Sequence, residues 1–346
     1  MGLRETHPLV RLIVLAGMLV AGCGGPDRQG PSASALQRQN LDPRARTFLW
    51  DVQQAQQRQD FNQALALIDS AAHYAPDFAD IFFLRGRVLT KLYRFNQAQA
   101  AFERVLELDP TYRSAAYNMG NNAFLLGRNR EAIKHYQREK AAFKGSPEAI
   151  AREASETDRA ALASVLLQIG RVYARLGVAD SARQAYQQVL VVEEDNAQAW
   201  GWLAEVSEDE GDLNQALAEA RRAFALAPEN IEYRYLVGAL SFRTGAFDEA
   251  AGHLEAVVRQ QAWHVGAHYN LGRCLLALGR EVEAQQYLDA TDGLQQLESD
   301  IILAKFALYR NPEDSEYWAQ LVTLYRQAGR LSEAREAYNI VRQLNK

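Results

Sequence analysis

The sequence predicts an all-α fold, a solenoid assembled from similar helical hairpins, and two observations carry this prediction. The first is composition. Hydrophobic residues make up 48% of the 346 residues, Ala, Leu, Gln, Glu and Arg dominate, and runs of Val, Ile and Thr are scarce, which favours helix. The second is a repeat with a period of 34 residues, visible in residues 61–65, 95–99, 213–217 and 247–251. Such a period is typical of stacked two-helix units.

The N-terminal segment has the pattern of a signal peptide. Arg4 and Arg11 precede an uncharged apolar run from Leu12 to Ala21. This run is shorter than the roughly 20 residues that span a bilayer, but it suits the core of a signal peptide. We therefore predict that residues 1–22 are removed from the mature chain.

The segment Leu19–Cys23 reads Leu-Val-Ala-Gly-Cys, an aliphatic residue and two small residues before a cysteine. It resembles the lipobox of bacterial lipoproteins, which implies that Cys23 becomes the lipidated first residue. An ordinary secretory signal with a chance cysteine is the alternative. Several acyl chains, at about 0.8 kcal/mol per buried methylene, would anchor the protein durably in a membrane.

Residues 23–44 are predicted to be a flexible tether, because Gly24 to Ser34 is rich in Gly, Pro and Ser. In Gram-negative lipoproteins an Asp after the cysteine tends to retain the protein in the inner membrane, and Gly24 stands there instead. The resemblance thus implies the outer membrane, facing the periplasm.

Two columns of small residues define the hairpins. Alanines recur in steps of 34 or 50 residues, at Ala64, Ala98, Ala132, Ala182, Ala216, Ala250, Ala284 and Ala334. Twelve residues before them stand Val52, Gly86, Gly120, Gly170, Ala204, Gly238, Gly272 and Val322. Helices approach closely only where side chains are small, so each pair predicts a helix crossing. Prolines such as Pro76 and Pro110 close the hairpins.

These columns, with aromatic residues between them, resemble the tetratricopeptide repeat family. The resemblance implies a right-handed superhelix whose first helices line a concave groove. Eight repeats are expected near residues 45–78, 79–112, 113–146, 163–196, 197–230, 231–264, 265–298 and 315–346.

The two 50-residue steps predict insertions at residues 147–162 and 299–314. Gly145-Ser146-Pro147 predicts a helix stop and a new start, hence a short extra helix before Thr157 caps the next unit. The apolar stretch from Leu294 to Tyr309 predicts a bent or lengthened second helix, with an added recognition edge as the alternative.

The sequence predicts no enzyme and no cofactor, because no nucleophile, acid–base pair or metal set converges. The net charge of −5 becomes one unit more negative without residues 1–22, which argues against nucleic acid. His253, His264 and His268 are interpreted as ordinary histidines and not as a zinc site. Cys274 is expected to be a buried thiol, because most of its counterparts in other repeats are apolar.

The resemblance places a set of polar and aromatic residues on the inward faces of first helices. The set is Arg87, Tyr117, Asn118, Asn121, Arg171, Tyr269, Asn270 and Arg273. In family members, asparagines at the positions of Asn118 and Asn270 often hold a peptide backbone, and arginine can bind a carboxylate. A solvated helix face is the alternative, and Glu205, Glu208 and Asp209 make the fifth repeat acidic.

The predicted function is that of a membrane-anchored protein-interaction scaffold of the bacterial envelope. It is similar to repeat lipoproteins that assist outer-membrane protein assembly, pilus or secretion machinery, or cell-wall enzymes. An accessory protein acting as a chaperone or a dimer is one alternative, and an enzyme, a small-ligand receptor or a cytoplasmic regulator are others. The last helix, with Tyr338, Ile340, Val341 and Leu344, is expected to leave apolar surface for a partner or a homodimer.

Overall fold

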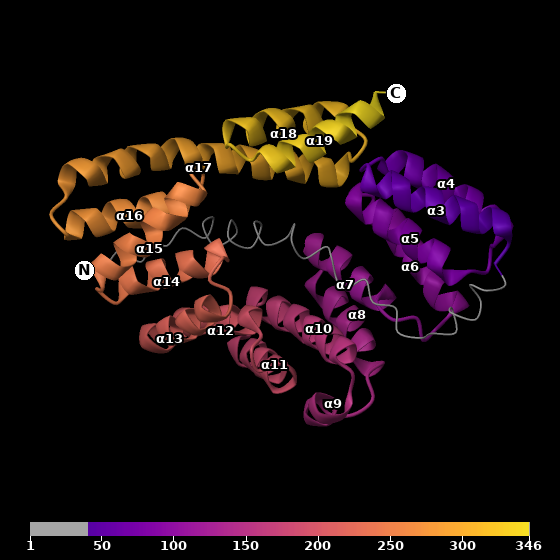
Figure 1. Cartoon of the computed structure of the whole chain (residues 1–346), viewed down its shortest axis with the longest axis horizontal. Coiled ribbons are helices and arrows are strands. Elements are labelled where there is room, and N and C mark those ends of the chain that lie inside the picture. The colour runs from indigo at the N-terminus through magenta and orange to yellow at the C-terminus, as the bar shows by residue number, and fades with distance from the viewer. Residues whose placement is uncertain (1–40, 346) are drawn as a thin grey trace. The chain divides into compact units, whose positions relative to one another are not determined.

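The computed structural model describes residues 41–345, and within this range the chain forms α-helices joined by short turns, without a β-strand. The described residues divide into two compact units. We call residues 41–188 with 301–345 the terminal unit, and residues 189–300 the middle unit. In each unit, antiparallel helices lie side by side as hairpins (Figure 1).

Most helices of the terminal unit come from the first half of the chain. They are α3 (Pro43–Gln57), α4 (Phe61–Tyr74), α5 (Ala79–Lys91), α6 (Phe95–Leu108), α7 (Ala115–Leu125), α8 (Asn129–Ala141), α9 (Pro147–Glu153), α10 (Glu156–Arg175), α18 (Ser315–Gln327) and α19 (Leu331–Leu344). Each hairpin packs on the next through α4 and α5, α6 and α7, and α8 and α10.

The middle unit repeats this arrangement. Its helices are α12 (Ala197–Glu210), α13 (Leu213–Leu226), α14 (Ile231–Arg243), α15 (Phe247–Gln260) and α16 (Val265–Ala277). Two further helices, α11 (Ala179–Val192) and α17 (Glu281–Arg310), each have residues in both units.

The predicted helix crossings are confirmed. The alanine column is fully buried except for Ala334, which is 4% exposed. A Cβ added to Gly120 would lie 2.5 Å from the ring of Tyr136, and one added to Gly170 would lie 2.3 Å from that of Tyr186. The glycines are therefore needed because an aromatic ring of the second helix lies directly against the first helix.

The first insertion contains a short helix, as expected, but its boundary differs from the prediction. Ser146 caps α9 and Pro147 occupies its first turn. The next helix is capped by Ser155, whose Oγ accepts a hydrogen bond from the Asp158 N–H at 3.1 Å. The prediction that Thr157 is the cap was wrong, because the reciprocal bond from Ser155 Oγ to the Asp158 carboxylate favours the earlier start.

The second insertion lengthens a helix. α17 runs without interruption from Glu281 to Arg310, so the second helix of its hairpin continues through Thr291–Gly293 and is lengthened, as one of the two expectations had it. At the start of the described range, α3 begins at Pro43, two residues before the expected solenoid boundary. None of the helices between residues 41 and 345 is both long and apolar enough to cross a membrane. The predicted signal peptide and Cys23 lie outside the described residues.

The C-terminal helix α19 is less open than expected. Ile340 is 5% exposed, and Val341 and Leu344 are half-buried. The prediction that Ile340 lies on an open apolar surface was therefore wrong, because this side chain is on the buried face of α19 with Ala334 and Ala337. Tyr338 is 46% exposed, as expected.

Candidate functional site

The candidate residues all lie on first helices of hairpins, and they divide between the two units. The terminal unit carries Arg87 on α5, three residues on α7 and Arg171 on α10. The middle unit carries Tyr269, Asn270 and Arg273 on α16. We describe the two sets separately.

The α7 residues are engaged in the structure of their own hairpin. The ring centroid of Tyr117 lies 5.8 Å from that of Tyr136. Asn121 Oδ1 accepts a hydrogen bond of 2.7 Å from the Tyr136 hydroxyl, and Asn118 Nδ2 donates one of 2.7 Å to the Ser114 carbonyl. Both asparagines are half-buried. Internal bonds thus fix their orientation before any partner arrives.

A carboxylate of the second helix holds the start of α7. Ser114 has left-handed backbone (φ 73°) and makes no side-chain cap. Instead, the Glu139 carboxylate accepts the N–H of Ser114 at 2.7 Å and that of Tyr117 at 3.3 Å. Burial raises the pKa of Glu139. The sequence carried a signal that we missed, because the positions equivalent to Glu139 in neighbouring repeats are Val105, Val189, Ala223 and Val257.

Two arginines of α10 stack on one ring of α7. The guanidinium of Arg171, 6% exposed, lies 5.0 Å from the Phe124 ring and donates to Gln168 Oε1 at 2.8 Å. Arg175, which the sequence analysis missed, lies 3.3 Å from the same ring and donates to the Phe124 carbonyl at 2.7 Å. Burial, together with the charge of Arg171, lowers the pKa of Arg175 to about 10. Arg175 therefore stays protonated at neutral pH, and the α7–α10 face carries positive charge.

Arg87 on α5 is half-buried and occupies the position equivalent to Asn121 and Arg171 in the neighbouring repeats. It extends the column of polar first-helix residues to a third hairpin of the terminal unit.

The middle unit presents a more open set of candidate residues. Tyr269 is 45% exposed, and the exposed Arg273 places its guanidinium 5.6 Å from the Tyr269 ring and 5.0 Å from the ring of Phe242 on α14. We call these three residues the α14–α16 face. A guanidinium in contact with two rings keeps its forked N–H groups available at lower entropic cost than a free side chain.

Buried aromatic contacts support this face. Asn270 Nδ2 donates to the Tyr235 hydroxyl at 3.3 Å, and the Tyr235 ring lies 4.2 Å from that of His264. Burial raises the pKa of the Tyr235 phenol, so this hydroxyl remains neutral. Gly266 is required here, because its Cβ would lie 2.4 Å from the Tyr235 oxygen.

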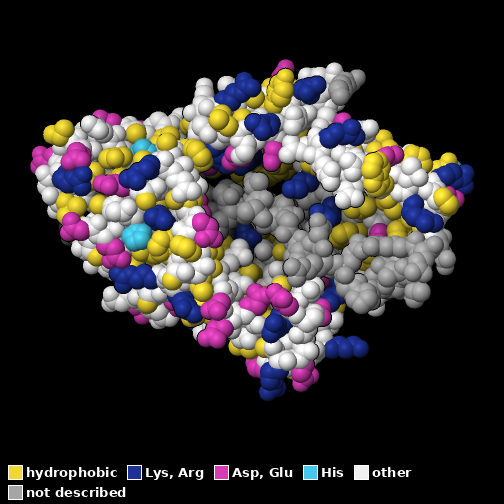
Figure 2. All heavy atoms as spheres, viewed as in Figure 1, with side chains coloured by type: hydrophobic (Ala, Val, Ile, Leu, Met, Phe, Trp, Pro, Cys, Tyr) yellow, Lys and Arg dark blue, Asp and Glu magenta, His cyan; other side chains and the backbone are white. Residues whose placement is uncertain are grey.

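Acidic residues offset part of the positive charge. Glu208 of α12 forms an ion pair with Arg243 of α14. On the side of the molecule drawn in Figure 2, Lys and Arg side chains are interspersed with Asp and Glu. The side drawn therefore shows no broad field of one sign.

The cysteine and the histidines have structural roles. Cys274 is fully buried and burial raises the pKa of its thiol to about 11, which confirms the predicted buried thiol. His264 Nδ1 accepts the Ala267 N–H at 3.1 Å and so caps α16. Between residues 41 and 345, no group of three His, Cys, Asp or Glu side chains could hold a metal ion.

Stacked hairpins with arginine–aromatic faces on their first helices define an all-α helical-repeat scaffold. Models of the tetratricopeptide repeat match residues 91–147, 167–231, 208–263 and 241–305, which together make up more than half of the chain. The chain belongs to the tetratricopeptide repeat family.

Two solved structures share this fold. The structure of PilW, titled a widely conserved type IV pilus biogenesis factor, has a TM-score of 0.54 and 16% identity over 68% of this chain and 100% of that chain. The structure of pilF from Pseudomonas aeruginosa has a TM-score of 0.52 and 15% identity over 65% of this chain and 95% of that chain. At these identities the likeness concerns the fold.

Proposed function

We propose that this protein is a lipid-anchored adaptor of the bacterial envelope, which binds a carboxylate-bearing segment of a partner protein on its first-helix faces. The observation that carries the proposal is the α14–α16 face, where the guanidinium of Arg273 contacts the rings of Phe242 and Tyr269 and remains exposed. Aromatic residues and arginine are the side chains that contribute most to protein interfaces.

The terminal unit supports the same proposal with a second set of first-helix residues, in which Arg175 is half-buried and Arg171 is buried. Arg171 and Arg175 share the ring of Phe124, and Asn118 and Asn121 are oriented by internal hydrogen bonds. A carboxylate can accept two parallel bonds from one guanidinium, which makes an acidic or C-terminal segment the partner of matching chemistry.

An accessory role in an assembly or secretion machine is the more specific form of this proposal. It draws on the fold shared with PilW, whose structure is described as that of a pilus biogenesis factor. The sequence supports the envelope part through the Leu-Val-Ala-Gly-Cys segment that ends at Cys23. An enzyme is the less favoured alternative.

A capture experiment tests the binding face. Purified protein is immobilised and incubated with solubilised membrane fraction, and captured proteins are identified by mass spectrometry. We expect Arg273→Glu to reduce recovery of the specific partner at least about tenfold, as for a central interface arginine. Arg259→Glu, on the exposed surface of second helix α15, is the matched control.

The terminal-unit face is tested in the same assay with the double variant Arg87→Glu, Asn118→Ala, which should also lower capture while helicity by circular dichroism stays unchanged. If both this variant and Arg273→Glu captured the partner as well as the control does, the binding surface would have to be assigned to the second helices or the insertions.

Metabolic labelling with a palmitate analogue tests the anchor. We expect label in the wild-type chain and none in Cys23→Ser. Cys274 serves as an internal control, because its buried thiol should not take up lipid. Label that persisted in Cys23→Ser would refute lipidation at this residue.

A further inference from the structure

In every hairpin, one residue of the turn between the two helices has left-handed backbone. In two hairpins this residue is not glycine. In six turns the residue is glycine, with φ between 73° and 88°: Gly127, Gly177, Gly211, Gly245, Gly279 and Gly329. In the first two hairpins it is Gln59 (φ 58°) and Tyr93 (φ 57°). Left-handed backbone costs free energy for any residue with a Cβ, so these two exceptions need a compensating contact.

Gln59 makes its contacts with the C-terminal helix of the same unit. Its side-chain Oε1 accepts a hydrogen bond of 2.9 Å from Asn339 Nδ2, and its carbonyl accepts one of 2.5 Å from Gln343 Nε2. By contrast, a Cβ placed on Gly127 or Gly177 would meet nothing within 4 Å. The side chain of Gln59 therefore has a binding partner, whereas a side chain at Gly127 or Gly177 would have none.

Tyr93 contacts the C-terminal segment through aromatic packing. Its ring centroid lies 5.4 Å from that of Tyr309 and 5.4 Å from that of Trp318. Phe95 adds a further contact to Tyr309 at 5.7 Å. Trp318 is only 4% exposed, so this packing removes a large apolar ring from water.

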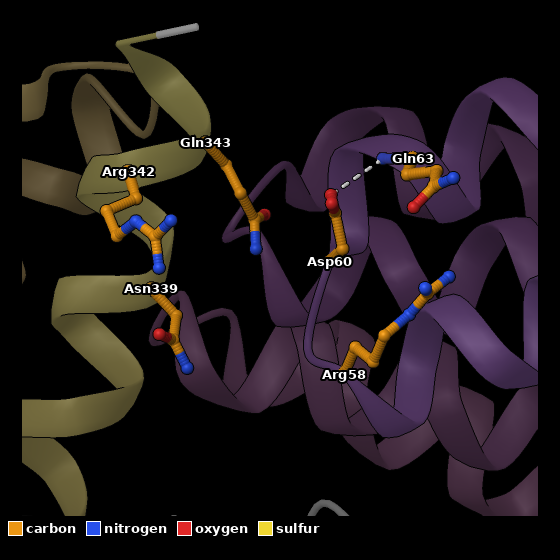
Figure 3. Close-up of a pocket in the computed structure, with 6 residues that line it drawn as sticks. All are labelled: Arg58, Asp60, Gln63, Asn339, Arg342 and Gln343. Atoms are coloured by element: carbon orange, nitrogen blue, oxygen red, sulfur yellow. Dashed lines mark hydrogen bonds between the residues drawn. The ribbon is translucent and has the colours of Figure 1, made fainter.

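An ion pair and a polar cavity complete the contact. Arg94, next to Tyr93, lies 2.9 Å from the Glu313 carboxylate in the turn before α18. Beside Gln59, a cavity of about 330 Å³ lies between α19 and the residues on either side of the first turn. In Figure 3, Asn339, Arg342 and Gln343 extend from α19 toward Arg58, Asp60 and Gln63 on the other side. The contact is thus apolar at Tyr93 and polar around Gln59.

We propose that the first two turns form a docking face for the chain's own C-terminal segment, residues 301–345, and that Gln59 and Tyr93 replace glycine because of this contact. The docking face consists of Gln59, Tyr93, Arg94 and Phe95. It holds the last hairpin of the terminal unit against its first two hairpins, which lie far from it in the sequence. The turn residue serves as a specificity element at these two places and as a simple helix terminator in the other six.

Removing the Tyr93 ring distinguishes a turn that docks the C-terminal segment from an ordinary turn. At a turn without further contacts, Tyr93→Gly would relieve backbone strain and stabilise the protein. If Tyr93 holds the C-terminal segment, the same variant releases residues 301–345. Hydrogen exchange of the full chain should then show faster exchange in α18 and α19, with unchanged exchange in α12 to α16. Tyr93→Phe, which keeps the ring, is the matched control and should exchange like the wild type.

Cross-linking across the cavity identifies the occupant of the docking face. Gln63 and Arg342 are exposed on opposite sides of the cavity, and neither contributes to the docking face. The full chain with Gln63→Cys, Arg342→Cys and Cys23→Ser is treated with a short bis-maleimide; the buried Cys274 thiol should remain unmodified. We expect a cross-link within one chain, and a several-fold lower yield when Tyr93→Gly is added.

Two results would overturn the proposal. One is hydrogen exchange and a cross-linking yield in Tyr93→Gly that equal those of the wild type, which would mean that the Tyr93 ring does not hold residues 301–345 in place. The other is a cross-link that joins two chains, which would assign the docking face to the last hairpin of a second copy.

Discussion

Where glycine stands at a helix crossing, it is needed because a large side chain of the second helix lies against it, an aromatic ring at Gly86, Gly120 and Gly170 and a leucine at Gly238 and Gly272. A Cβ on Gly170 would lie 2.3 Å from Tyr186, which is fully buried and cannot move aside. The same contact recurs at Gly86 and Phe102. Side-chain size at one position therefore decides whether a hairpin closes.

We expect Gly170→Ala to destabilise the terminal unit by about 1–3 kcal/mol, the usual cost of overpacking a core. Chemical denaturation followed by circular dichroism measures the effect. Gly252→Ala is the control, because a Cβ on Gly252 would meet nothing within 4 Å. That variant should be neutral or stabilise by up to about 1 kcal/mol through higher helix propensity. Equal stability of Gly170→Ala and wild type would contradict the crossing geometry.

A histidine gives the middle unit a pH dependence. His268 is 8% exposed, and burial lowers its pKa below the ordinary value of 6.5. Because the folded state keeps the neutral form, the unfolded state binds the proton first as the pH falls through about 6.5. Stability is therefore retained above this pH and lost below it, by at most about 1.4 kcal/mol per pH unit.

Denaturation of wild type and His268→Gln between about pH 7 and pH 5 tests this dependence. We expect a shallower pH slope in the variant, whatever its stability at pH 7. Identical slopes would assign the pH dependence to other groups, such as His253, whose pKa is also lowered by burial.

At the level of the helix, local capping sets the boundary that follows the first insertion. Ser155 Oγ accepts from the Asp158 N–H, and its hydroxyl donates to the Asp158 carboxylate at 2.9 Å. Arg113 of the preceding repeat pairs with the same carboxylate at 2.5 Å and lowers the pKa of Asp158. The start of α10 is thus tied to the hairpin before it.

We expect Ser155→Ala to cost about 1 kcal/mol, the usual value for loss of a helix cap. Hydrogen exchange should locate the increase at the first turn of α10. Ser155→Thr, which keeps a hydroxyl that can both accept the Asp158 N–H and donate to the Asp158 carboxylate, should recover most of the loss. A variant without a cap that exchanged like the wild type would argue that Arg113 and Asp158 alone hold this end.

For the whole molecule, the repeat explains why so much of the fold could be predicted. The alanines and glycines mark the crossing of two helices that are adjacent in sequence. Because the same crossing recurs in each hairpin, these residues recur at a fixed period that the sequence shows. The roles of Glu139 and Arg175 escaped prediction, because each side chain binds the backbone of another helix, and the repeat pattern does not report such a contact. The contact of Tyr93 with Trp318 escaped for a related reason, since no period of 34 residues links these two positions. Whether the eight candidate residues bind a partner remains a prediction.

Stability in a chain of stacked hairpins should be local. Each hairpin packs mainly on its sequence neighbours, so free energy is roughly a sum of nearest-neighbour contributions. We expect Gly170→Ala to accelerate hydrogen exchange in α10 and α11 and to leave α14 to α16 unchanged. Uniform acceleration over all described helices would instead indicate one cooperative folding unit.

The two non-glycine turn residues should also show correlated substitutions among homologues of this protein. If Tyr93 is conserved because it packs on Trp318, homologues that have glycine at the position of Tyr93 should no longer have tryptophan at the position of Trp318. Gly127 and Gly177, with open space around them, should show no such correlated replacement. Substitutions in the second and the last hairpins would then be correlated across homologues, whereas those in the hairpins between them would not.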